Sequence, residues 1–172
     1  MKKNLFICIL IAGALILSNC SKKDDTTTTK TNTNTTGKTS YKASGAITYT
    51  AGGVNYSLAP DSVVKETDNL VIYGFNLTPY ASVIINVLSA TAISTGTFTI
   101  PNAILTFSDN SYNTYQASVL YTSSTCTINI TALSSTSVKG TFTATAALVY
   151  GTGAAATVGV TNGVINCTLS TK

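Results

Sequence analysis

Apolar and polar residues alternate along most of the chain beyond residue 43, with the period of two that is typical of β-strands. In the segment 138–150, for example, Phe142, Ala144 and Ala146 fall on one face and threonines fall on the other. No stretch after Ser21 keeps a helical period for long enough to predict a helix. The alternation therefore predicts an all-β domain over residues 43–172.

Clusters of glycine, proline and asparagine divide this domain into short strands. Gly52 and Gly53 mark a tight turn between the expected strands 45–50 and 54–58. The segment 80–88 is apolar on both faces, which favours a central position in a sheet. About nine or ten strands at this spacing indicate an antiparallel β-sandwich, with a calycin-like β-barrel as the alternative.

A different pattern occupies residues 1–19. Lys2 and Lys3 precede an apolar run from Leu5 to Leu17. This run suits the central region of a secretory signal peptide, and it is shorter than the roughly twenty residues that span a bilayer. We therefore expect residues 1–19 to be a signal peptide.

The apolar run ends in Leu17-Ser18-Asn19-Cys20, which resembles the lipobox of bacterial lipoproteins, with Asn19 in place of the usual Gly or Ala. The resemblance implies that the Cys20 thiol carries a diacylglycerol and that Cys20 is the first residue of the mature chain. A secreted protein with a chance cysteine is the alternative. Several acyl chains make a durable anchor, whereas a single chain gives only marginal membrane binding. Apart from this covalent lipid, we expect no cofactor.

The charged segment Lys22-Lys23-Asp24-Asp25 follows directly after the cysteine. It resembles the short export signal that sends lipoproteins of Bacteroidota-type bacteria to the outer face of the outer membrane. The resemblance implies a cell-surface protein; the alternative is a solvated charge cluster on a protein that faces the periplasm. The rest of residues 20–42 is rich in Thr, Asn and Lys, which predicts a flexible tether that reaches about 20–25 Å.

Charge and composition exclude several classes of function. The formal net charge of +4 comes from the signal and the tether, because lysines and acids nearly balance in the β-domain. A domain with so little charge and no arginine has no electrostatic footprint for nucleic acid. The absence of histidine removes His-based nucleophilic sites, acid–base catalysis and zinc ligation. With few acids remaining as well, we expect a non-catalytic domain.

One polar loop offers oxygen ligands for a cation. Asp109, Asn110, Ser111 and Asn113 lie close together in the sequence, but a single carboxylate is too few for a typical calcium site. We therefore expect a plain turn and no metal site.

Two cysteines belong to the β-domain. Cys126 alternates in phase with Ile128 and Ile130, and Cys167 with Ile165 and Leu169, so both side chains are expected to point into the core. An exported protein can oxidise its thiols. A core disulfide between Cys126 and Cys167, or at least close neighbours, is our expectation, and two separate buried thiols are the alternative.

Tyrosine is the most informative residue type for binding. The candidates Tyr112, Tyr115 and Tyr121 follow one polar loop, where aromatic faces stack on sugars or on a partner protein. The alternative is that tyrosines only cover a half-buried sheet. The second half, with Val138–Ala144 and Val160–Ile165, also resembles small all-β lipoproteins of Bacteroidota-type bacteria, a resemblance that carries no catalytic residues.

The sequence thus predicts an outer-membrane lipoprotein with a binding or adhesion module for a glycan or a protein. A structural or accessory envelope component is the alternative. A small-ligand carrier is a third possibility if the domain is a barrel with a cavity.

Overall fold

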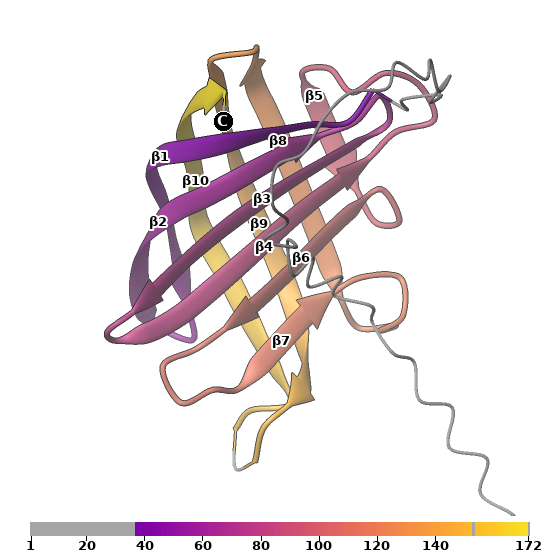
Figure 1. Cartoon of the computed structure of the whole chain (residues 1–172). Coiled ribbons are helices and arrows are strands. Elements are labelled where there is room, and N and C mark those ends of the chain that lie inside the picture. Colours follow the sequence, from indigo (N-terminus) through magenta and orange to yellow (C-terminus); the bar gives the residue numbers. More distant parts are fainter. Residues whose placement is uncertain (1–36, 153, 172) are drawn as a thin grey trace, which may run out of the picture. The chain divides into compact units, whose positions relative to one another are not determined.

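Ten antiparallel strands and no helix make up the part of the chain that our computed structural model describes, residues 37–152 and 154–171 (Figure 1). The lipobox and the export signal lie outside the described residues. The strands are β1 (Thr39–Ala51), β2 (Val54–Lys65), β3 (Asn69–Leu77), β4 (Tyr80–Leu88), β5 (Gly96–Thr99), β6 (Ala103–Ser108), β7 (Thr114–Ala117), β8 (Thr125–Leu133), β9 (Ser137–Tyr150) and β10 (Thr157–Thr171).

The sheet closes on itself, so the domain is a barrel and not the two-sheet sandwich that we expected. Strand β10 pairs with β1 on one side and with β9 on the other, which completes an eight-stranded antiparallel ring in the order β1-β2-β3-β4-β6-β7-β9-β10. Strand β8 pairs with the same edge of β9 as β7 does, but farther along it, and β5 pairs with β8. Closure removes the open sheet edges that a sandwich leaves.

The two ends of the barrel differ in what they contain. One end, which we call the loop end, holds the β1–β2, β3–β4, β6–β7 and β9–β10 connections and lies at the bottom of Figure 1. The other, the terminal end, holds the start of β1 and the end of β10, where Tyr41 pairs with Thr171. The barrel therefore presents four connections at the end opposite to the start of β1 and the end of β10.

The alternation of the sequence directs the apolar side chains inward, as expected. Ile47, Leu58, Ile72, Ile85 and Leu105 are all buried to 1% exposure or less in one continuous core. Burial of each such side chain contributes about 1.5–3 kcal/mol to the hydrophobic driving force. The interior is thus packed with side chains along most of its length, as is usual for a barrel of eight strands.

Strand β10 comes close to Phe142 of β9 at Gly163. Gly163 follows a bulge at which Asn162 adopts a φ of 53°, and a Cβ at position 163 would meet the carbonyl oxygen and the ring of Phe142 on β9. Gly159, on the same strand, has no atom within 4 Å of its would-be Cβ. The two glycines therefore form a matched pair.

We expect Gly163→Ala to lower the free energy of unfolding by about 1–3 kcal/mol, because the methyl group forces Phe142 or the backbone to move. Gly159→Ala should change it by less than about 0.5 kcal/mol. Urea denaturation of both variants measures the difference. Equal stability of the two would show that β10 does not pack against Phe142 in this way.

The cysteines are buried as expected, but they form no disulfide. Cys126 and Cys167 are free thiols, at 3% and 0% exposure. Cys126 lies opposite Ala144 of β9, and Cys167 lies opposite Val138 of the same strand. Six residues of strand separate these partners, which is about 20 Å, whereas a disulfide needs Cα atoms within about 7 Å. The expectation of close neighbours is therefore wrong.

Burial raises the pKa of the Cys126 thiol to about 12 and that of the Cys167 thiol to about 11. In the unfolded chain both thiols ionise near pH 9, so above that pH the unfolded state binds fewer protons than the folded state. The free energy of unfolding should therefore fall as the pH rises from about 9 to 11. Urea denaturation across this range measures the slope. The double variant Cys126→Ala/Cys167→Ala should show a shallower fall, and an equal slope would assign the pH dependence to other groups.

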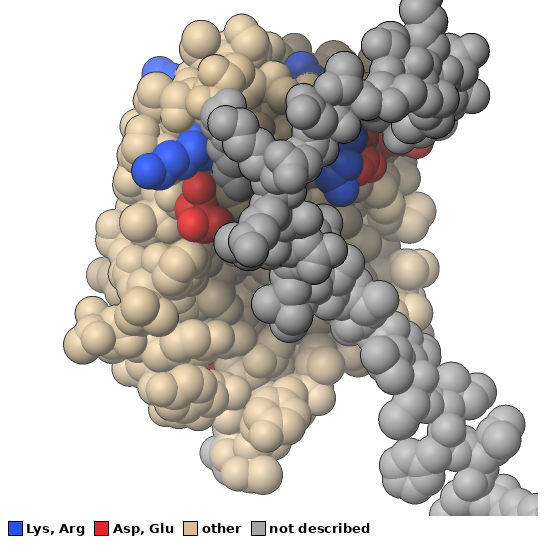
Figure 2. Space-filling model, viewed as in Figure 1, with Lys and Arg blue, Asp and Glu red and all other residues tan. Residues whose placement is uncertain are grey.

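Charged side chains gather toward the terminal end. Lys38 and Glu66 form an ion pair there at 3.3 Å, and Lys65 and Asp68 flank the β2–β3 turn. Figure 2 shows lysines and acids in the upper half of the view, whereas most of the lower half carries neither. Among the described residues, Asp109 is the charged group at the loop end. The loop end is therefore almost uncharged.

Candidate functional site

Aromatic rings fill the barrel interior next to the loop end. Tyr49 stacks on Tyr56 with ring centroids 4.9 Å apart, and Phe107 stacks on Tyr115 at 5.1 Å. Tyr49 also meets Phe107 and Phe142 edgewise or at a tilt, both at 5.9 Å, so the rings form one cluster. Alternation explains the cluster, because every member lies at an inward-facing position of β1, β2, β6, β7 or β9.

A pocket of about 300 Å³, the mouth pocket, opens above this cluster. Tyr56, Phe107 and Tyr115 contribute its aromatic surface. The surrounding walls come from three connections that are distant in the sequence: the β1–β2 turn, the β6–β7 loop and the β9–β10 loop. Their lining residues are Ala51, Gly52, Val54, Asp109, Asn110, Asn113, Ala154, Ala155 and Val158.

Asp109 and Asn113 hold the β6–β7 loop in shape. The Asp109 carboxylate accepts hydrogen bonds from the backbone N–H of Ser111 at 2.8 Å and of Asn113 at 2.9 Å. It also accepts one from Nδ2 of Asn113 at 2.9 Å. A carboxylate has about four lone-pair sites, so one acceptor direction of Asp109 is left for another donor. The loop that we expected to be a plain turn is thus held by its own hydrogen bonds and forms one wall of the pocket.

The phenol groups of the cluster stay protonated at ordinary pH. Burial is the main reason why the pKa of Tyr49, Tyr56 and Tyr115 is raised, and the negative charge of Asp109 adds to the effect in each case. The Tyr49 side chain is 2% exposed, and its hydroxyl has no hydrogen-bond partner among the described residues. The pocket therefore lies over neutral hydroxyl groups in an apolar setting.

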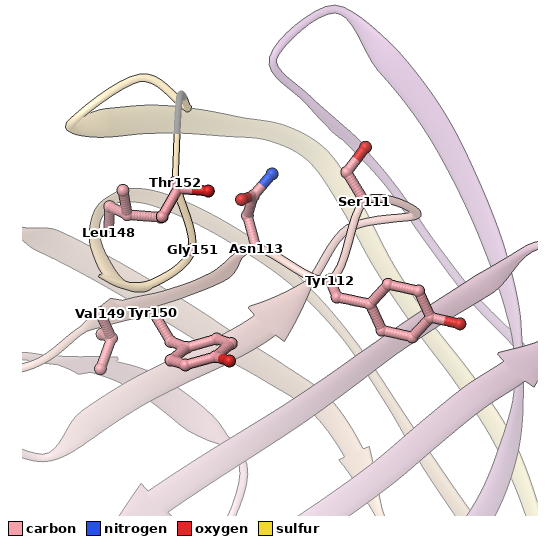
Figure 3. Close-up of a pocket in the computed structure, with 8 residues that line it drawn as sticks. All are labelled: Ser111, Tyr112, Asn113, Leu148, Val149, Tyr150, Gly151 and Thr152. Carbon is pink, nitrogen blue, oxygen red and sulfur yellow. The ribbon is translucent and has the colours of Figure 1, made fainter.

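A second hollow of about 540 Å³, which we call the side groove, shares a lining residue with the mouth pocket. Figure 3 shows the residues that line the side groove. Asn113 lines both. The other lining residues come from the β6–β7 loop and the end of β9 with its following loop: Ser111, Tyr112, Leu148, Val149, Tyr150, Gly151 and Thr152. Figure 3 shows the rings of Tyr112 and Tyr150 on one side of the loops and the Asn113 amide pointing to the other.

Gly151 allows the two loops to come together. Its φ is 133°, and a Cβ there would meet the side-chain amide of Asn113, with Cγ only 2.9 Å away. A glycine is therefore required on both conformational and steric grounds. The contact joins the β9–β10 loop to the Asp109–Asn113 wall.

Large apolar side chains are exposed around the loop end. Tyr112 and Tyr150 are 63% and 72% exposed, and Val54, Leu77 and Val149 are exposed as well. Tyr112 also stacks on Tyr80 at 4.7 Å, which fixes the orientation of its ring. We call Val54, Leu77, Tyr112, Val149 and Tyr150 the rim. An exposed apolar rim next to a pocket is typical of an interaction surface.

The structure separates the tyrosines that the sequence pointed to. Tyr112 lies on the rim, and Tyr115 lies inside, against the mouth pocket. Tyr121 lies in a turn between β7 and β8, and it lines neither hollow. Phe107 and Tyr150 were not singled out from the sequence, and Asp109 and Asn113 were considered only as possible cation ligands. The sequence feature that could have pointed to Tyr56 and Tyr150 is their position next to the end of a strand, which Tyr112 shares.

The two hollows offer aromatic faces, neutral polar groups and one carboxylate, that of Asp109. Within residues 37–152 and 154–171, no group of three or more His, Cys, Asp or Glu side chains is placed to hold a metal ion. The same part of the chain contains no helix with the length and hydropathy of a membrane span. No protein-family model, curated protein or solved structure matches this chain, so its own geometry is the basis for assigning a function.

Proposed function

We propose that this chain is a lipid-anchored binding module of the bacterial outer membrane, with a non-catalytic, calycin-like barrel that recognises a glycan or a protein at its loop end. The observation that carries the proposal is the mouth pocket, which sets an aromatic surface of Tyr56, Phe107 and Tyr115 into an almost uncharged end. Ligand sites are concave and combine apolar surface with a few polar groups that orient the ligand, and this pocket sets aromatic rings beside Asp109, Asn110 and Asn113.

The position of the tether supports this assignment. Strand β1 begins at the terminal end, so a tether that leads from Cys20 to Thr39 joins the barrel opposite the mouth pocket. If the lipid on Cys20 anchors the chain in the membrane, the loop end is free to face away from the membrane. The spacer of about 20–25 Å then gives a ligand room to approach.

A small-ligand carrier is the second candidate, favoured by the barrel closure and by the pocket at its mouth. Buried side chains such as Leu105 and Ile165 fill the interior farther in. A carried ligand would therefore sit at the mouth of this barrel. Barrels with a wider interior hold their ligand deep inside.

Ligand arrays test the proposal. The full-length chain, purified in detergent, is applied to arrays of glycans and of extracellular proteins, beside the variant Tyr112→Ala/Tyr150→Ala and the control Tyr73→Ala on the outer wall. We expect ligands of the wild-type chain to bind the rim variant about tenfold more weakly and the control equally well. Ligands that bind all three chains alike would contradict recognition at the loop end.

A further inference from the structure

The chemistry of the loop end restricts which ligands fit it. The lysines of the described residues, Lys38, Lys42, Lys65 and Lys139, lie toward the terminal end. Asp109 puts a negative charge beside the mouth pocket. An anionic ligand would meet no cation there and would be repelled by the carboxylate. The loop end therefore favours a neutral ligand.

Aromatic rings and uncharged hydrogen-bonding groups are both among the residues that line each hollow. The mouth pocket combines Tyr56 and Tyr115 with Asn110 and Asn113, and the side groove combines Tyr112 and Tyr150 with Ser111 and Thr152. Aromatic faces carry negative charge density that attracts polarised C–H groups. A sugar ring presents such C–H groups on its faces and hydroxyl groups around its edge, so it matches both parts of this lining.

One hydrogen-bonding group at the mouth pocket lacks part of its complement. Asp109, which lines the pocket, keeps one acceptor direction. A hydroxyl group of a ligand would fill it by donating a hydrogen bond to the carboxylate.

We propose that the loop end binds a neutral oligosaccharide, with one sugar unit in the mouth pocket and the adjoining units in the side groove. This inference rests on the proposed function and names the ligand class of the same site. The shared residue Asn113 makes the two hollows adjacent, so a chain of linked rings occupies both. Occupation of both hollows requires more than one ring, so affinity depends on chain length.

Titration calorimetry on the full-length chain in detergent tests the ligand class. The probes are neutral gluco-, manno-, xylo- and N-acetylglucosamine hexasaccharides, their monosaccharides, and a hexamer of galacturonic acid. We expect at least one neutral hexasaccharide to bind about tenfold or more tightly than its monosaccharide. Binding of the acidic hexamer alone, or of no saccharide at about 10 mM, would overturn the inference.

Variants locate the second subsite. Tyr150 is largely exposed, so its replacement leaves the core intact. We expect Tyr150→Ala to weaken hexasaccharide binding about tenfold without changing monosaccharide binding, and Tyr150→Phe to bind as the wild-type chain does, since it keeps the stacking face. Leu120→Ala, at an exposed position outside both hollows, is the matched control. If Tyr150→Ala leaves the hexasaccharide affinity unchanged, the side groove is not part of the binding site.

The outcome for other ligands separates this inference from the proposed function. A protein ligand, or a vesicle of neutral phospholipid, that loses affinity in Tyr112→Ala/Tyr150→Ala would refute the oligosaccharide and leave the loop end as the binding surface. If saccharides, proteins and vesicles all bind that variant with the same affinity as the wild-type chain, both proposals are wrong.

Discussion

Replacing Cys20 with alanine is expected to remove the protein from the membrane fraction, either by releasing it or by halting it as an unprocessed precursor. The reason is that the resemblance to a lipobox implies that the Cys20 thiol carries the lipid anchor. Each acyl methylene contributes about 0.8 kcal/mol to membrane affinity, so loss of two or three chains is close to an all-or-none change. Fractionation of cells with an antibody against the barrel measures it.

Cys8→Ala is the matched control for this experiment, because Cys8 lies within the expected signal peptide. It should leave processing and membrane retention unchanged. Retention of the Cys20→Ala chain at the level of the Cys8→Ala chain would mean that the protein is held by something other than a lipid on Cys20.

Phe107→Ala should cause the largest loss of stability among single core substitutions at the loop end, about 3–5 kcal/mol. Phe107 is 1% exposed, stacks on Tyr115 and meets the edge of Tyr49, so its removal leaves a cavity lined by rings that have lost their partner. A typical domain is stable by only about 5–15 kcal/mol. Thermal and urea denaturation measure the change.

Phe75→Ala is the control, since Phe75 lies on the outer face of β3 and is 43% exposed. Phe75→Ala should lower the free energy of unfolding by less than about 1 kcal/mol. Equal losses for Phe107→Ala and Phe75→Ala would contradict an aromatic core under the mouth pocket.

The strands could largely be predicted from the sequence, because alternation reports directly which side chains face the core. The expected strands 80–88 and 138–150 agree with β4 and β9 to within one residue at each end. Closure could not be predicted, because it depends on β10 pairing with both β1 and β9. Alternation gives the faces of a strand and says nothing about its neighbours.

The cysteines and tyrosines show the same limit. The inward orientation of Cys126 and Cys167 follows from alternation, but their separation follows from their registers on β9, which no local pattern contains. Tyr112 and Tyr115 are close in sequence, yet one is exposed and the other buried, because Tyr112 lies in the β6–β7 loop and Tyr115 lies at an inward-facing position of β7. The mouth pocket draws on three connections that are far apart in the chain, so its composition emerges only when the barrel closes.

We propose that the loop end, and not the terminal end, meets the ligand while the protein is displayed on the cell. A photoreactive diazirine amino acid placed at Tyr112 or Thr152, and for comparison at Thr67 or Ser135 of the terminal end, tests it in intact cells. Irradiation followed by mass analysis should give covalent adducts from Tyr112 and Thr152 and none from Thr67 and Ser135. Adducts from the terminal end alone, or from neither end, would contradict ligand recognition at the loop end.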